Sequence, residues 1–192
     1  MGEKSIQKKN YIIVKAREVF QEKGYLTVTM KDIVEACEIS RGGLYLYFDK
    51  LSDIFMEVLR LESEEADDVF MPAISESMSS ADILALFLQE QKKELLRTKN
   101  SLSRAIFEFN FQNEIPAKEN SLRKQFDMAV KVIERLIIGG NEEGDFRCED
   151  PRGAARNIMY VIEGLRISAQ TIGITEETVN REILYLMKSI AA

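Results

Sequence analysis

Apolar side chains recur at helical spacing along most of this chain. Ile13, Ala16 and Phe20 fall on one helical face, and Gly24 follows them as a signal for a helix C-terminus. The same spacing returns in later segments, and convincing alternation with a period of two is absent. The apolar positions of these segments are Leu51, Ile54, Phe55, Val58 and Leu61; Leu84, Phe87, Leu88 and Leu95; residues 102–111; Leu122, Phe126, Ala129, Ile133 and Leu136; Ala155, Ile158, Ile162, Leu165 and Ala169; and Val179, Ile183, Met187 and Ile190. The pattern predicts an all-α chain of about nine helices.

Residues that begin helices stand close together near the start of the chain. Thr29 followed by Asp32 is a capping-box pattern, in which a hydroxyl and a carboxylate satisfy free backbone N–H groups. Ser40 has the side chain of an N-cap and opens a short helix through Leu44 and Tyr45. Two short helices are therefore expected one after the other.

Residues that end helices divide the rest of the chain. Pro72 and the serine-rich stretch 75–80 interrupt the apolar pattern. The long helix that begins near Leu122 is expected to end at Gly139-Gly140, because glycine often follows the last helical turn. Residues 141–151 are then a turn-rich link.

The composition removes several classes of function. Among the 192 residues, 45% are hydrophobic, 30% are charged and none is histidine. Histidine-ligated metal sites, catalytic triads that use histidine and histidine proton shuttles are therefore excluded, and we expect no metal, no cofactor and no enzyme activity. Cys37 and Cys148 are too far apart for a CxxC pair, so free thiols in the cytoplasm are the simplest interpretation. No apolar run approaches the roughly 20 residues of a membrane span, and we expect no membrane partner.

Charge is unevenly divided along the chain. Residues 1–50 carry nine Lys/Arg and seven Asp/Glu, whereas the whole chain has a net charge of −6. A slightly basic start therefore precedes an acidic remainder. This fits a small DNA-binding module on an acidic domain, since only the module has to meet phosphates. A difference of this size also arises by chance.

The segment 29–48 has the arrangement of a helix-turn-helix, with two short helices about three residues apart. The second helix is too short to bury much of itself, so its first turn is available to DNA. The apolar seam between the two helices is expected to contain Ile33, Ala36, Ile39 and Leu44.

The start of the second helix carries small and basic side chains. Gly42 and Gly43 let the backbone come close to a phosphate or a base edge. Arg41 can reach guanine acceptors or a phosphate, and the hydroxyls of Tyr45 and Tyr47 can bond to the phosphate backbone. Taken alone, the two tyrosines are better interpreted as half-buried core aromatics; within this motif we favour phosphate contact, more for Tyr47 than for Tyr45.

At these residues the chain resembles the tetracycline-repressor (TetR) family of bacterial transcription regulators. The matching residues are Thr29, Ile33-Val34, Ala36, Glu38-Ile39-Ser40, Gly42 and Tyr45-Leu46-Tyr47-Phe48. The stretches 16–30 and 142–165 also resemble the family. Glu38 stands where the family has glycine in the turn, which predicts a turn that is either slightly strained by a left-handed residue or shaped differently. Leu51 stands where the family tends to have a lysine, and Lys50 lies one residue earlier.

The resemblance implies a homodimeric, ligand-responsive repressor that works in the cytoplasm on palindromic operator DNA. It implies a helix-turn-helix DNA-binding domain at 1–50 and a helical ligand-binding and dimerisation domain at 51–192. The expected DNA-binding residues are Thr29, Ser40, Arg41, Gly42, Gly43, Tyr45, Tyr47 and Lys50. Lys8 and Lys9 are equally a DNA-contacting arm or a solvated terminus.

An effector pocket is expected in the second domain, because phenylalanine and methionine are dense there. Phe107, Phe111 and Met159 are the candidate wall residues for an apolar or amphipathic effector, although each can equally be ordinary core. Nearby polar residues are more readily read as paired or solvated charges than as ligand contacts; they are Arg104, Glu108, Asn110, Glu163 and Arg166.

The last two long helices, 151–172 and 175–190, are expected to form the dimer interface as a four-helix bundle. Their apolar residues cover more of the helix circumference than one core face needs. The candidate interface residues are Ala155, Ile158, Val161, Ile162, Leu165, Ile183 and Met187.

Other functions compete with this interpretation. A helical enzyme is disfavoured by the lack of histidine. A helical protein-interaction module without DNA binding stays open, as does an activator, which differs from a repressor only in where its operator lies.

Overall fold

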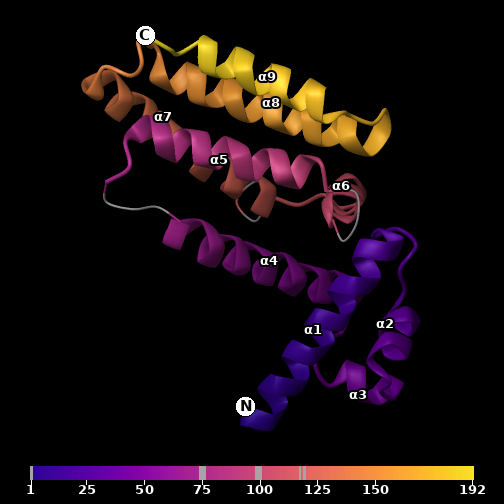
Figure 1. The fold of residues 1–192 in the computed structure, drawn as a ribbon. Coiled ribbons are helices and arrows are strands. Elements are labelled where there is room, and N and C mark those ends of the chain that lie inside the picture. The colour runs from indigo at the N-terminus through magenta and orange to yellow at the C-terminus, as the bar shows by residue number, and fades with distance from the viewer. Residues whose placement is uncertain (1, 74–76, 98–100, 117, 119) are drawn as a thin grey trace. The chain divides into compact units, whose positions relative to one another are not determined.

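The computed structural model describes residues 2–73, 77–97, 101–116, 118 and 120–192. Within these residues the chain forms nine helices and no strand, which confirms the predicted all-α fold (Figure 1). The helices are α1 (Glu3–Lys23), α2 (Met30–Cys37), α3 (Arg41–Tyr45), α4 (Leu51–Ala73), α5 (Ser80–Leu95), α6 (Ser103–Gln112), α7 (Ser121–Glu143), α8 (Pro151–Thr171) and α9 (Glu176–Lys188).

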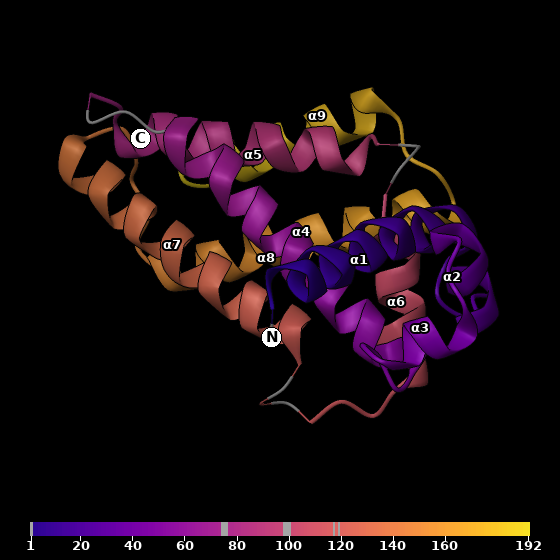
Figure 2. The same ribbon diagram turned by 90° about the horizontal axis from the view of Figure 1, so that it is seen from below.

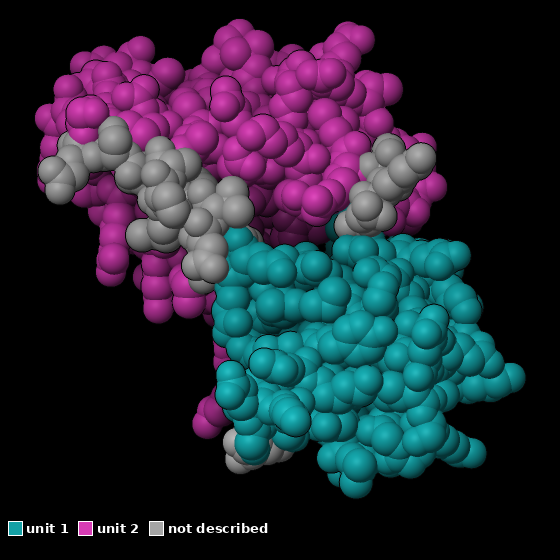
Figure 3. Space-filling model, turned by 60° about the horizontal axis from the view of Figure 1, so that its bottom comes forward, with its two compact units in different colours: residues 1–71, 98–114 teal, residues 72–97, 115–192 magenta. Residues whose placement is uncertain are grey.

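Two compact units divide the chain (Figure 3). Unit 1 consists of residues 1–71 and 98–114, and unit 2 consists of residues 72–97 and 115–192. These bounds differ from the expected division at residue 50, because most of α4 and the whole of α6 belong to the first unit. The functions expected of the two parts stay predictions.

An aromatic cluster joins three segments of unit 1. The ring centroids of Phe20 and Phe55 lie 4.8 Å apart, and those of Tyr25 and Phe109 lie 4.9 Å apart, both pairs edge to face. Such pairs contribute about 0.5–1.5 kcal/mol beyond the burial of their area. The cluster holds α1, α4 and α6 in one core, and α6 contacts α1, beside which it lies in Figure 2.

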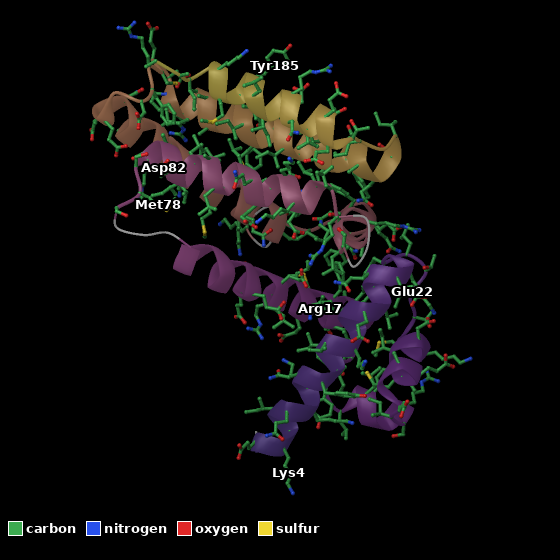
Figure 4. The ribbon with its side chains drawn as sticks, in the orientation of Figure 1. Lys4, Arg17, Glu22, Met78, Asp82 and Tyr185 are labelled. Carbon is green, nitrogen blue, oxygen red and sulfur yellow. The ribbon has the colours of Figure 1, made fainter. Side chains whose placement is uncertain are left out.

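Ion pairs also connect α1 to α4 within unit 1. Arg17, labelled in Figure 4, lies 3.1 Å from Glu62 and 2.6 Å from Glu65. Lys9 lies 2.6 Å from Glu57 and faces the ring of Phe48. Lys9 is therefore paired in this structure.

Unit 2 is a helical bundle in which α5, α7, α8 and α9 surround a shared core. α8 contacts all three of the other helices, and α5 contacts α7 and α9. The most deeply buried side chains of this core are Leu84, Leu88, Ile133, Ile137, Ile158 and Ile162.

The helix α7 does not end at Gly139-Gly140, so that prediction is wrong. It continues to Glu143 and ends at Gly144, whose φ is 88°. A Cβ at Gly140 would collide with the ring of Phe146, and one at Gly139 would collide with the hydroxyl of Ser80. The two glycines therefore allow close packing inside a helix, and Gly144 supplies the left-handed residue that stops it.

The turn between α2 and α3 contains a non-glycine residue in the left-handed region. Glu38 has φ 52° and ψ 42°, and among the described residues it alone combines a side chain with a positive φ. Its N–H bonds to the carbonyls of Glu35 and Val34 and so closes α2. Of the two alternatives that the sequence left open, the structure shows the left-handed residue.

We predict that Glu38→Gly raises the free energy of unfolding by about 1 kcal/mol, because glycine avoids the Cβ–carbonyl clash of a left-handed residue. Urea unfolding followed by circular dichroism measures this change. Glu38→Ala keeps the Cβ and is the control, which should give no comparable gain. Equal stabilities of the glycine and alanine variants would contradict the prediction.

Candidate nucleic-acid interface

The start of α2 is fixed by a complete capping box. The Thr29 hydroxyl accepts the N–H of Asp32, and the Asp32 carboxylate accepts the N–H of Thr29 at 2.8 Å. Lys23 at the end of α1 lies 2.6 Å from the same carboxylate. Hydrogen bonds from Lys23 and then Thr29 hold the pKa of Asp32 well below its usual range, so the cap stays charged far into acid.

The start of α3 is fixed by Ser40, whose hydroxyl accepts the N–H of Gly43 at 3.1 Å. Leu44 is fully buried and anchors α3 against the rest of unit 1. Arg41 and Tyr45 are exposed, with the guanidinium 5.7 Å from the ring centroid, and Tyr47 is half-buried. One face of this short helix is therefore packed, and the other presents a cation and an aromatic hydroxyl.

Gly42 has no reason within the fold to be glycine. Its backbone is helical, and a Cβ built there would meet no heavy atom within 4 Å. Glycine in a helix costs roughly 0.5–1 kcal/mol relative to alanine. At Gly43, by contrast, a Cβ would lie 3.2 Å from the Ser40 hydroxyl. The bare backbone at Gly42 is thus open to whatever approaches α3 from outside.

The other expected DNA-binding residues are less free. The Thr29 hydroxyl is engaged in its cap, donating to Asp32 at 2.5 Å. Lys50 is exposed and lies 3.7 Å from Asp53. Leu46, which the sequence reasoning did not single out, is 82% exposed at the end of α3. The signal that could have found it is its place between Tyr45 and Tyr47.

The three expected pocket residues do not come together in either unit, as far as the described residues show. Phe107 and Phe111 belong to unit 1, with ring centroids 6.4 Å apart, and Phe111 is 83% exposed. Met159 is buried in the core of unit 2. Phe111 is therefore a surface residue of unit 1 and Met159 a core residue of unit 2, and their role in an effector pocket stays a prediction.

A surface cavity of about 310 Å³ lies between α7 and α8 of unit 2, and none of the expected pocket residues lines it. Its lining mixes apolar and charged side chains of both signs. They are Phe126, Asp127, Val130, Lys131, Glu134, Arg152 and Arg156. The polar residues near the expected wall are paired, as favoured from the sequence: Arg104 with Glu108 at 2.7 Å and Arg166 with Glu163 at 3.1 Å.

Most of the residues expected at a dimer interface are buried inside unit 2. Ala155, Ile158, Ile162 and Leu165 are buried in the chain's own core, and the remaining three, Val161, Ile183 and Met187, pack partly against it. Burial in the core argues against the first four as contacts with a partner, and the choice of Val161, Ile183 and Met187 stays a prediction. The exposed apolar side chains of the same two helices are Tyr160, Ile167, Leu184 and Tyr185, the last labelled in Figure 4.

The described residues also bear on metal sites, membrane-spanning helices and reactive thiols. They contain no group of histidine, cysteine, aspartate and glutamate side chains that could hold a metal ion. None of their helices is long and apolar enough to cross a membrane. Cys37 is buried, and this burial raises the pKa of its thiol, as fits the small core residue expected from the sequence.

Known proteins resemble this chain over most of its length. It is 29% identical over 143 residues to the uncharacterized HTH-type transcriptional regulator YfiR of Bacillus subtilis, covering 73% of this chain and 68% of that protein. It is 23% identical over 159 residues to the HTH-type transcriptional regulator QacR of Staphylococcus aureus, covering 82% and 83%. A transcriptional regulator from Saccharomonospora viridis, solved in complex with choline, has the same fold, with a TM-score of 0.82, 19% identity and coverage of 96% and 97%.

Two family models match the chain, one near its start and one in its second half. Residues 12–58 match the bacterial regulatory proteins of the tetR family, and residues 83–180 match the tetracyclin repressor-like C-terminal domain. The first range contains the capped helices α2 and α3, and the second spans about half of the chain. The chain therefore belongs to the TetR family of bacterial transcription regulators.

Proposed function

We propose that this protein is a ligand-responsive transcriptional repressor that binds a palindromic operator as a homodimer in the bacterial cytoplasm. The observation that carries this proposal is the exposed face of α3, where Arg41 and Tyr45 flank the bare backbone of Gly42. Repression rather than activation is supported by relatives such as IcaR of Staphylococcus aureus, a negative transcriptional regulator of a biofilm operon.

In this proposal α3 lies in the major groove. Arg41 reads guanine, whose two major-groove acceptors match its fork of donors. The backbone at Gly42 and Gly43 approaches the DNA closely, and the hydroxyls of Tyr45 and Tyr47 bond to phosphates without reading sequence. Lys50 is only weakly held by Asp53 and adds a further phosphate contact.

The dimer is proposed to form through the outer faces of α8 and α9. Gly164 is exposed in the middle of α8, and a Cβ there would meet nothing within 4 Å. Tyr160 and Ile167 lie on the same helical stripe as Gly164, and Leu184 and Tyr185 are exposed on α9. A glycine flanked by exposed apolar side chains lets a second helix approach closely, which fits an apolar interface between two copies.

The effector is proposed to be a small apolar or amphipathic molecule bound in unit 2. That the effector is a small molecule is supported by the similar Saccharomonospora viridis regulator, which was solved with choline, whereas its apolar character rests on the phenylalanine and methionine content of the chain. The effector acts by binding one dimer geometry better than the other, and it shifts the equilibrium only by that difference in affinity.

We predict specific binding to duplex DNA that weakens steeply with salt. If a dimer neutralises roughly 6–10 phosphates, affinity falls by roughly 10³–10⁵ between about 50 and 200 mM salt. A gel shift with the DNA upstream of the protein's own gene, or with duplexes selected from a random pool, measures this. A helical module that binds protein instead would give no salt-dependent shift with any duplex.

We predict that Gly42→Ala makes the free protein more stable and its operator binding weaker. The methyl group should add about 0.5–1 kcal/mol to the free energy of unfolding, because α3 loses a glycine. The same methyl group would stand between the backbone and DNA. Thermal unfolding and fluorescence anisotropy with a labelled operator measure the two effects, and Gln89→Ala, an exposed helical position in unit 2, is the control. Unchanged DNA affinity would remove Gly42 from the interface.

We predict that Gly164→Leu converts the dimer to folded monomers. The isobutyl group has room in the isolated chain, so the monomer fold is kept while the partner helix is pushed away. Sedimentation equilibrium measures the mass, and circular dichroism checks the fold. Gln170→Leu adds the same group to an exposed position on another stripe of α8 and should leave the dimer intact. A Gly164→Leu protein that is still dimeric would place the interface elsewhere.

A further inference from the structure

The α1–α2 turn of unit 1 is held by a carboxylate from a distant part of the sequence. Glu108 of α6 accepts the backbone N–H of Tyr25 at 2.6 Å and that of Leu26 at 2.9 Å, both on Oε2. Its other oxygen, Oε1, accepts the Nε–H of Arg104 at 2.7 Å. Only 15% of the Glu108 side chain is exposed, whereas 59% of the Arg104 side chain is.

The turn is shaped to admit this carboxylate. Gly24 has φ 77°, and a Cβ there would lie 2.6 Å from Oε2 of Glu108. Glycine is therefore required at this position by its backbone angle and by the approach of the acceptor. Burial on its own would raise the pKa of Glu108, but hydrogen bonds from Leu26, Arg104 and Tyr25 together hold the pKa below its ordinary value. The acceptor is consequently charged at neutral pH, which strengthens its hydrogen bonds.

The held turn leads directly into the helix-turn-helix. The Thr27 hydroxyl donates to the carbonyl of Lys23 at 2.7 Å, and the Lys23 ammonium group bonds to Asp32 at 2.6 Å. Asp32 in turn caps α2 through Thr29. The carboxylate of Glu108 and the cap of α2 are thus hydrogen-bonded to the same short backbone segment, residues 23–29, and α2 packs against α3.

The position of α6 in the chain gives this contact a further consequence. The segment 98–114 belongs to unit 1, yet the residues on both sides of it belong to unit 2. A third connection between the units runs through α4. With Glu108 bound to the turn, two of the three covalent connections from unit 2 reach the helix-turn-helix through α6.

We propose that Glu108 is a positioning residue for operator binding, which fixes the α1–α2 turn and thereby the orientation of α2 and α3. This inference rests on the proposed function as a DNA-binding regulator. Glu108 itself does not touch DNA. It raises the fraction of molecules whose helix-turn-helix has the binding geometry, and apparent affinity falls in proportion when that fraction falls.

Three substitutions separate the contributions of the carboxylate. Glu108→Gln keeps an oxygen at the same reach, so it can still accept from Tyr25 and Leu26. Glu108→Asp keeps the charge but is one methylene too short. Arg104→Ala removes the exposed ion pair alone, and such pairs contribute little.

The experiment measures the affinity of full-length variants for the duplex that the wild-type protein selects from random-sequence DNA. We expect Glu108→Asp and Glu108→Ala to bind about tenfold more weakly, while Glu108→Gln and Arg104→Ala stay within about threefold of wild type. Amide hydrogen exchange gives the second readout: Tyr25 and Leu26 should lose protection in the Asp and Ala variants only. Ile54→Val, which removes one methyl group from the buried core of the same unit and leaves the Glu108 hydrogen bonds in place, should leave affinity unchanged.

The outcomes distinguish this inference from the proposed function. If the wild-type protein selects no duplex, the proposed function fails. If it selects one and Glu108→Asp binds as tightly as wild type, Glu108 is not a positioning residue and the proposed function stands. Should Glu108→Ala unfold, the Asp and Gln variants decide, because equal losses in both would show that reach to the two N–H groups is not what matters.

Discussion

The exposed face of α3 depends on the aromatic contact among Phe20, Tyr25, Phe55 and Phe109. A helix of five residues is far too short to be stable by itself. Leu44 is the only residue of α3 that is fully buried, so the helix is stabilised by packing on the core of unit 1. α1, α4 and α6 each contribute a ring to one cluster in that core. The surface proposed to read DNA is therefore maintained by residues that never approach DNA.

Burial fixes where α2 and α3 lie, whereas polar contacts fix where they begin and end. The Thr29–Asp32 box and the Ser40 cap each satisfy N–H groups that the first turn of a helix leaves free. Glu38 then accepts a left-handed backbone, at a cost of about 1 kcal/mol, so that the chain can turn sharply between the two helices. This cost is tolerated because α2 is closed by the N–H of the same residue. The turn is thus fixed on one side by the hydrogen bonds of the Glu38 N–H at the end of α2 and on the other by the Ser40 cap of α3.

The sequence predicted those features whose partners lie within a few residues. The capping box, the Ser40 cap, the stop at Gly24 and the strain at Glu38 all depend on neighbours in the chain, and the structure has each of them. The predictions that failed depend on distant neighbours. Gly139-Gly140 looks like a helix stop unless one knows that Phe146 folds back against it.

The burial of several residues that were expected at a dimer interface has the same origin. Helical periodicity shows that α8 has a wide apolar face, but not how many helices share it. In unit 2 that face is covered by α5, α7 and α9, so Ala155, Ile158 and Ile162 are used up inside the chain. Glu108 was also beyond reach, because its turn lies more than eighty positions earlier in the sequence.

The ten glycines offer a more local test of what the fold itself requires. Gly24, Gly144 and Gly173 have positive φ, and Gly2 is the N-cap of α1. Side-chain atoms occupy the place of a Cβ at Gly139, Gly140 and Gly153, and at Gly43 a Cβ would be in tight contact with the Ser40 hydroxyl, 3.2 Å away. Only Gly42 and Gly164 remain, both helical and both open to solvent within the chain. Each glycine destabilises its helix, and no contact within the chain requires glycine there. We therefore infer that the reason for each lies outside the chain. Because one belongs to unit 1 and the other to unit 2, two different partners satisfy this requirement most simply: a nucleic acid at α3 and a second copy of the chain at α8.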